Sequence, residues 1–245
     1  MSLLRSPRLS LLITLLASVL SPILLKAQAP YRFYTSYTFE PNIYQSLQWT
    51  LCISPAGSGS ENGCFVAGFL GPFGKADALI EGNPSVVDAN TITHAIYVVD
   101  TEGGHGTGVT LYVYKETIIV KDPGASTVTL LTTVPLKLTG GGSAICSMAG
   151  NDKFLFIGTN QTKHALRVRK SDLTVTNAGE WGLGATVISM SSDKRGYITI
   201  NFGAGGSNSG NIQYAPDGYF LGYSGPEFHF LLNTNIAVSA ETFVP

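Results

Sequence analysis

Apolar and polar residues alternate with a period of two along most of the chain after residue 30. In "LQWTLCI", residues 47–53, every second residue is a large apolar one. In "YITINF", residues 197–202, Ile198, Ile200 and Phe202 share one face. This alternation is typical of half-buried β-strands. Similar runs rich in Val, Ile, Thr, Tyr and Phe recur between turn residues, so the pattern predicts an all-β fold.

Helical periodicity is almost missing from this pattern. The nearest candidate for a helix is "GKADALIEG", residues 74–82, and its glycines limit it to one or two turns. Turn signals are frequent. Pro123 and Gly124 in "KDPGA" predict a type II turn, and "GNDKF", "SSDKRGY" and "APDGY" are further turn sequences.

Two sequence elements recur along the chain. "LYVYKETIIV" (111–120) and "LRVRKSDLTV" (166–175) share Leu, Val, Lys and Val at the same offsets, and "IQYAPDGYFL" (212–221) is a looser third copy. "SMAGNDKFLFIG" (147–158) resembles "SMSSDKRGYITIN" (189–201) in the same way. Each copy is expected to form a strand, a tight turn and a second strand. Chained together, these elements predict four short antiparallel strands per 42–55 residues.

This repeating unit resembles a blade of the β-propeller proteins, over roughly residues 95–245. The chain carries no Trp-Asp, kelch or Asp-box signature of a particular propeller family. The resemblance implies a small propeller-like array of four-stranded antiparallel blades, because stacked sheets cover each other's faces. A β-sandwich with repeated hairpins is the alternative. Residues 31–94 match the repeat poorly. If a ring closes, "YRFYTSYTF" (31–39) is expected to add a strand to the last blade.

The N-terminus has the layout of a secretory signal peptide. Arg5 and Arg8 precede an uncharged apolar run at 9–25, and small residues follow it. The alternative is a membrane anchor, but the run is shorter than the about 20 apolar residues of a spanning helix. We expect removal of residues 1–29, with cleavage after Ala27 or Ala29. Residues 30–245 would then be a single all-β domain without a membrane span, secreted or otherwise extracytoplasmic.

The three cysteines fit that location. Cys52 and Cys64 flank a Gly/Ser-rich segment and are predicted to form a disulfide, as expected in an oxidising compartment. Cys146 lies in the apolar run "AICSM" and is predicted to be a buried small hydrophobic residue.

Charge and motif content exclude several functions. The net charge is −1 with 13% charged residues and no basic run, so no nucleic-acid partner is expected. The four histidines are far apart, calcium-loop and C-x-x-C patterns are missing, and no metal or cofactor is expected. His94, His164 and His229 lie in strand-like runs and are interpreted as structural.

Four residues remain as weak candidates for ligand binding. His105 lies in the polar loop "TEGGHGTG", and Trp181 lies in the Gly-flanked loop "GEWGLG", where an exposed indole would suit stacking on a sugar ring. Glu102 and Glu180, together with Asp100, are the carboxylates at strand ends that glycoside hydrolysis would require. For each of them an exposed loop residue or a core-capping side chain is the simpler structural role.

These observations favour a secreted, non-enzymatic binding or structural module of β-propeller type. Its partner is expected to be a carbohydrate or another protein, and carbohydrate binding is the most concrete form of this hypothesis. The alternative is a secreted polysaccharide-degrading enzyme that uses loop carboxylates. A chain that completes its ring by dimerising is a third possibility. The repeated hairpins keep their apolar positions while the other positions vary, so any site is expected on loops.

Overall fold

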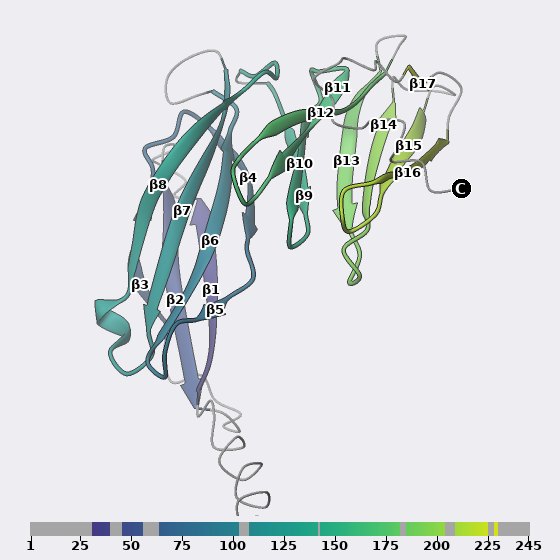
Figure 1. The fold of residues 1–245 in the computed structure, drawn as a ribbon. Helices are drawn as coiled ribbons and strands as arrows, with labels where there is room; N and C mark the ends of the chain where they lie inside the picture. The colour runs from purple at the N-terminus through teal and green to yellow at the C-terminus, as the bar shows by residue number, and fades with distance from the viewer. Residues whose placement is uncertain are drawn as a thin grey trace, which may run out of the picture. The chain divides into compact units, whose positions relative to one another are not determined.

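The fold consists of strands joined by turns and loops (Figure 1). The computed structural model describes residues 31–39, 46–55, 64–102, 108–141, 143–181, 185–203, 209–224 and 228–229. These residues form four antiparallel sheets and no α-helix. The all-β prediction is therefore confirmed.

The strands group into sheets in chain order, except that the last strand, β17, joins the third sheet. The first sheet, β1-β2-β3, consists of β1 (Tyr31–Phe39), β2 (Leu47–Pro55) and β3 (Cys64–Leu70). The second contains β4 (Ala76–Glu81), β5 (Ser85–Val86), β6 (Thr91–Asp100), β7 (Val109–Ile119) and β8 (Thr127–Leu136). The third contains β9 (Cys146–Gly150), β10 (Phe154–Thr159), β11 (His164–Arg169), β12 (Val175–Trp181) and β17 (Phe228–His229). The fourth contains β13 (Thr186–Ser192), β14 (Ile198–Gly203), β15 (Ser209–Tyr214) and β16 (Phe220–Ser224).

The last three sheets repeat one plan. Each contains four antiparallel strands that neighbour one another in chain order: β4-β6-β7-β8, with the short β5 off this path, β9-β10-β11-β12 and β13-β14-β15-β16. β5 pairs with Ile92 and Thr93 near the start of β6, and β4 pairs with the later residues of β6. β4 and β5 therefore lie on the same side of β6. The predicted array of four-stranded antiparallel units is therefore present.

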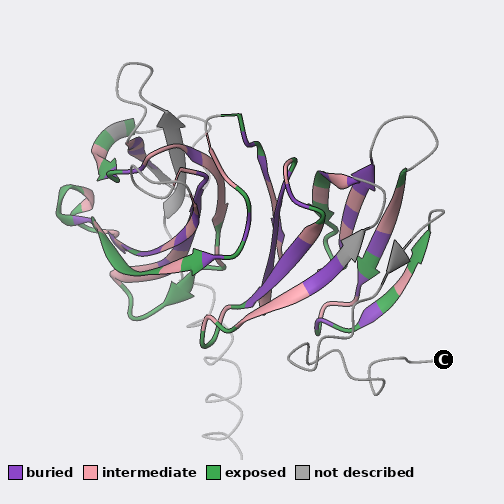
Figure 2. Cartoon of the chain, turned by 90° about the horizontal axis from the view of Figure 1, so that it is seen from above, coloured by how far each residue is buried: buried purple, intermediate pink, exposed green. Residues whose placement is uncertain are grey.

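Apolar clusters join successive sheets. Trp49 of β2 and Ile96 of β6 share one cluster, and Val99 on the opposite face of β6 shares a second with Leu155 of β10. A third cluster combines Phe156 of β10 with Ile200 of β14. Strands covered on both faces, such as β10 and β11, are therefore buried along most of their length, whereas the outer strand β8 is largely exposed (Figure 2). The first strands of the repeated sheets are also neighbours, with β4 beside β9 and β9 beside β13.

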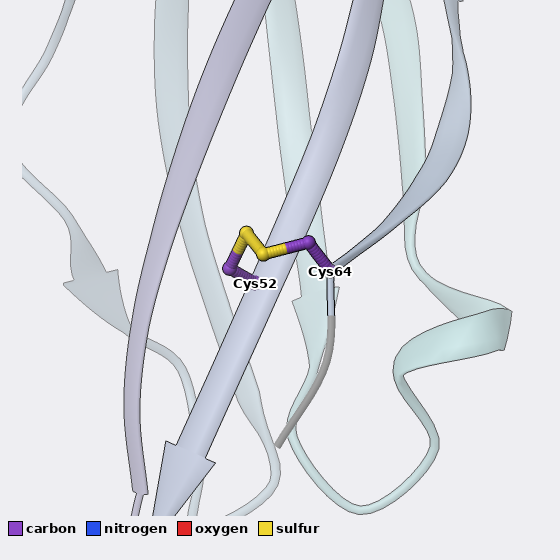
Figure 3. The surroundings of a disulfide bond; sticks show 2 residues. All are labelled: Cys52 and Cys64. Carbon is purple, nitrogen blue, oxygen red and sulfur yellow. A yellow bond between two sulfur atoms is a disulfide. The ribbon is translucent and has the colours of Figure 1, made fainter. Parts of the chain in front are cut away.

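The chain divides into two compact units. One comprises residues up to Ser36 together with Thr50–Phe65, and the other comprises Tyr37–Trp49 and Val66–Pro245. The predicted disulfide between Cys52 and Cys64 belongs to the first unit and connects β2 to the start of β3 (Figure 3). The stacked clusters all belong to the second unit. Cys146 is buried in the cluster between the second and third sheets and is free, as predicted.

Two local predictions were wrong. "LYVYKETIIV" is not a hairpin, because residues 111–119 continue as the single strand β7. "GKADALIEG" contains strand β4 and no helix, because residues 76–81 pair along β6. In both segments, pairing with a strand distant in the sequence decides the conformation, against the preference of the local residues.

Two further predictions about chain direction also need correction. "KDPGA" forms a 3-10 turn at Pro123–Ala125, in which Ala125 N donates to Asp122 O (2.9 Å). Gly124 is not among the described glycines with positive φ, which a type II turn would require. The strand "YRFYTSYTF" is β1 and belongs to the sheet with β2 rather than to the last four-stranded unit.

Candidate functional site

A cleft lies where tight turns from successive sheets meet. Its cavity measures about 530 Å³. It is lined by Ile80, Glu81 and Asn83 at the end of β4, by residues 150–153 and Lys170 of the third sheet, and by residues 193–197 and 215–217 of the fourth. The name turn cleft is used below for these residues. All of them belong to the second unit of the chain.

Asn151 ties the turns of the third and fourth sheets together. Its Oδ1 accepts the backbone N–H groups of Lys153 (2.9 Å) and Phe154 (2.9 Å), which closes its own turn. Its Nδ2 donates to the carbonyl oxygens of Gly196 (2.9 Å) and Pro216 (3.1 Å). Because these bonds use both donors and both lone pairs of the amide, the side chain holds one orientation. Asn151 therefore builds the cleft and has no free group for a ligand.

The turn at residues 193–197 is closed in a similar way. Asp193 Oδ1 accepts from Arg195 N (2.9 Å) and Tyr197 N (3.0 Å). The Tyr197 N–H is the main cause that lowers the pKa of the Asp193 carboxyl. Gly196 has φ +85°, and a Cβ there would lie 3.3 Å from Asn151 Cβ. A glycine thus suits both the left-handed backbone and the close approach of the two turns.

The cleft carries both signs of charge in equal number. Mixed donors and acceptors on fixed turns suit a ligand whose own groups both donate and accept, and sugar hydroxyls do so. The acids are Glu81, Asp152, Asp193 and Asp217, and the bases are Lys153, Lys170, Lys194 and Arg195.

Lys170 is the half-buried base of this set. Its ammonium lies 5.0 Å from the centroid of the Tyr97 ring, a cation–π arrangement. Burial lowers the pKa of Lys170, and the nearby Asp152 carboxylate opposes that shift. Within the described ranges, Lys153, Lys170 and Lys194 form no ion pair. Their ammonium groups can therefore donate to a ligand without first breaking a salt bridge.

Tyr197 provides the aromatic surface of the cleft. The residue is 38% exposed, and the Arg195 guanidinium lies 4.9 Å from the centroid of its ring. Arg195 is itself held by Asp193, with Nε 3.2 Å from Oδ2. The phenol thus combines a flat apolar surface with a hydroxyl, a combination that suits sugar recognition.

Of the four candidates predicted from sequence, Glu102 is the one whose side chain is described, and it does not line this cleft. Glu102 follows the end of β6, is half-buried, and its N–H donates to Asp100 Oδ1 (2.9 Å). Glu180 and Trp181 end strand β12, but their side chains lie outside the described residues, as does the whole of His105. β6 and β12 lead away from the turns of the cleft, so Glu102 and the backbone of Glu180 and Trp181 lie at the opposite ends of their strands. Their role in binding stays a prediction.

The sequence predicted the turns that line the cleft, but it did not predict that they come together. "GNDKF", "SSDKRGY" and "APDGY" supply residues 150–153, 193–197 and 215–217 of the cleft. The repeated Asp-Lys dipeptides at 152–153 and 193–194 were a further signal. The sequence pattern does not show that the turn at Asn151 contacts turns more than 40 residues later in the chain.

Asp100, the third predicted carboxylate, has a structural role. It is fully buried and accepts the N–H groups of Gly74 (2.8 Å), Lys75 (2.7 Å) and Glu102 (2.9 Å). A carboxylate holding three backbone donors fixes the loop before β4 to the end of β6. This residue is therefore removed from the set of candidate catalytic acids.

The described histidine side chains have structural partners as well. His94 is buried and contacts the fully buried Glu116 directly across the β6–β7 pair. Burial lowers the pKa of His94, while Glu81 opposes the shift. His164 Nε2 lies 2.9 Å from Lys137 O. Across the described ranges, no group of three His, Cys, Asp or Glu residues is arranged to hold a metal ion.

Comparisons with known proteins add little to this picture. No family model matches the chain, and no curated protein matches it. AztD from Citrobacter koseri is similar at 11% identity over 81% of this chain, with a TM-score of 0.31, and the chain spans about half (47%) of its length. The calcium-binding protein regucalcin from Agrobacterium tumefaciens is similar at 13% identity over 77% of this chain and 72% of its own, with a TM-score of 0.27.

A putative hydrolase from Bacteroides ovatus is similar at 10% identity over 78% of this chain and 68% of its own, also with a TM-score of 0.27. Similarities this weak carry no argument about fold or activity. The propeller-like description rests on the repeated four-stranded sheets of this chain itself. In the described part of the chain, no helix has the length and apolar character needed to cross a membrane.

Proposed function

We propose that this chain is a secreted, non-enzymatic binding module that holds a carbohydrate in the turn cleft. The observation that carries the proposal is the composition of the cleft. It has equal numbers of acids and bases, an exposed tyrosine, and a cavity of about 530 Å³ on turns fixed by Asn151 and Asp193. A neutral polyhydroxylated ligand can use donors and acceptors together and needs no excess charge.

Secretion is supported by the disulfide and by the N-terminal sequence. A bridge between Cys52 and Cys64 is typical of an oxidising compartment. Residues 1–29 have the layout of a signal peptide but lie outside the described residues. Detection of the mature N-terminus at residue 28 or 30 in the secreted fraction would test this part of the proposal.

The binding test uses the chain from Pro30 on a panel of glycans and soluble polysaccharides, with reducing-sugar release measured in the same wells. For a ligand that binds, Tyr197→Ala is expected to weaken affinity about tenfold, roughly 1.4 kcal/mol. Tyr219→Ala is the matched control, because Tyr219 is equally exposed at 40% and does not line the cleft. Equal effects of the two substitutions, or no glycan bound, would contradict the proposal.

The same wells address the loop candidates and the enzyme alternative. If Trp181→Ala abolishes binding while Tyr197→Ala does not, the binding site is at the end of β12 and not in the turn cleft. Sugar release that is lost in Glu102→Gln or Glu180→Gln would replace the binding module with a carboxylate-dependent polysaccharide-degrading enzyme.

A further inference from the structure

We propose that one end of the third sheet binds a divalent transition-metal ion such as Zn²⁺ through His164, Glu180 and His229. These residues lie on three neighbouring strands, β11, β12 and β17. His164 is the Cα partner of Glu180, and Glu180 is in turn the Cα partner of His229. Strand pairing therefore places two histidines on either side of a glutamate, in one row across the sheet.

The three positions of this row share one face of the sheet. Residues directly opposite each other in antiparallel strands lie on the same face. The pairing of β11 with β12 is regular from His164 to Ala165, and the bulge follows between Ala165 and Leu166. The two pairs that join β12 to β17 are also in regular register. The row thus crosses no bulge that would put one member on the other face.

The row has the spacing and the residue types of a metal site. Cβ atoms of directly opposite residues are about 5 Å apart, so the two histidine positions are about 10 Å apart, with the glutamate between them. An ion over the middle strand is within reach of ligands from all three strands. Two imidazoles and one carboxylate bind zinc in enzymes and leave a fourth position open. Imidazole nitrogen also favours zinc and neighbouring transition metals over calcium and magnesium.

The hydrogen bond of His164 supports this assignment. Its Nε2 lies 2.9 Å from the carbonyl oxygen of Lys137, the residue that follows β8. Because a carbonyl oxygen only accepts, Nε2 carries the proton, and in the neutral ring Nδ1 then has the lone pair. Metal-binding histidines usually donate their second ring N–H to a carbonyl or a carboxylate, which fixes the tautomer and the ring orientation. His164 has this arrangement already.

The other two ligands are placed by strand register. The side chains of Glu180 and His229 lie outside the described residues, so their positions in the row come from the backbone pairs. Sequence spacing does not reveal such a row, because a local search for paired histidines detects only ligands a few residues apart. The site is therefore expected to exist in the folded chain alone.

Zinc binding to the chain from Pro30 tests the proposal, with no histidine tag and after dialysis against EDTA. Titration calorimetry with Zn²⁺ is expected to give one site per chain. Loss of an outer partner of a ligand weakens binding roughly 10–100-fold, so Glu180→Gln and His229→Ala are each expected to weaken it by at least about 100-fold. His105→Ala is the matched control, because it removes a histidine between β6 and β7, away from the row.

Circular dichroism confirms that each variant is folded. Absence of zinc binding, or binding that His105→Ala weakens as much as His229→Ala does, would overturn the proposal. So would one-site binding that Glu180→Gln leaves unchanged.

Cobalt(II) reports on the ligands directly. Bound by two imidazoles, a carboxylate and a water molecule, Co²⁺ is expected to show the strong visible absorption of a four-coordinate ion. Glu180→Gln should change or abolish this band, and His105→Ala should keep it. The weak spectrum of the hydrated ion with the wild-type chain would contradict the site. No glycan is used, so the metal proposal and the carbohydrate proposal can each fail alone.

Discussion

The two copies "LYVYKETIIV" and "LRVRKSDLTV" adopt different structures. In the first, residues 111–119 form strand β7, which pairs with β6 and β8 along its length. In the second, β11 ends at Arg169, and Leu173 N donates back to Arg169 O (2.8 Å) before β12 begins. The shared apolar positions therefore determine which face is buried, while the residues after the lysine decide whether the chain turns.

The difference has a local cause. Asp172 Oδ1 accepts the N–H of Thr174 (3.1 Å), and Leu173 has a left-handed backbone with φ 58°. The matching residues of the first copy are Thr117 and Ile118, β-branched residues that favour extended backbone. A strand therefore continues where a turn forms in the other copy. The predictions below test that contrast.

The largest effect is expected at the matched positions 118 and 173. Ile118→Asn places an amide at a fully buried strand position and is expected to cost about 4 kcal/mol in the free energy of unfolding. Leu173→Asn should cost only about 1 kcal/mol, because asparagine tolerates the left-handed backbone. Urea unfolding followed by circular dichroism measures both. Equal costs would mean that the two positions do not differ as strand and turn.

A second comparison concerns the acids of the two sheets. Asp100→Ala leaves three partly buried backbone N–H groups without their acceptor and is expected to cost about 3 kcal/mol. Asp172→Ala removes an exposed turn acid with one described backbone bond, and a far smaller loss is expected. The same unfolding measurement applies. If Asp100→Ala were as stable as the wild type, the buried carboxylate would not hold the loop before β4.

Matched core positions should behave alike. Val113 and Val168 occupy the same offset in the two copies and belong to one apolar cluster. Each Val→Ala substitution is expected to cost about 2 kcal/mol, through lost apolar burial and the cavity left behind. A difference above about 1 kcal/mol between the two variants would show that one copy lies outside the shared core.

The smallest effect is chemical and leaves stability unchanged. Burial is the main cause that raises the pKa of the Cys146 thiol to about 12. Because the thiolate is the nucleophile, iodoacetamide at pH 8 should leave Cys146 unlabelled in the folded protein and label it after unfolding in guanidinium. Mass spectrometry measures the labelled fraction. Fast labelling of the folded protein would show that the cluster between the second and third sheets opens.

The sequence predicted the fold class better than the course of individual strands. Alternation and repeats correctly indicated an all-β chain of four-stranded units. The sequence around the cysteines correctly indicated the Cys52–Cys64 disulfide and the burial of Cys146. The same approach placed a hairpin within β7 and named the segment of β4 as the nearest candidate for a one- or two-turn helix. Both errors arose because local residue preference was used where pairing with β6 decides the conformation.

The candidate site depended more on tertiary structure. Period-two patterning is local, so the chain by itself determined which side chains face the cores and which segments turn. Tertiary structure alone decided that the turns at 151, 196 and 216 meet. The third and fourth sheets must first stack through their apolar faces before Asn151 can reach Gly196 and Pro216. The turn cleft is thus a product of long-range packing, because no short segment contains the groups that form it.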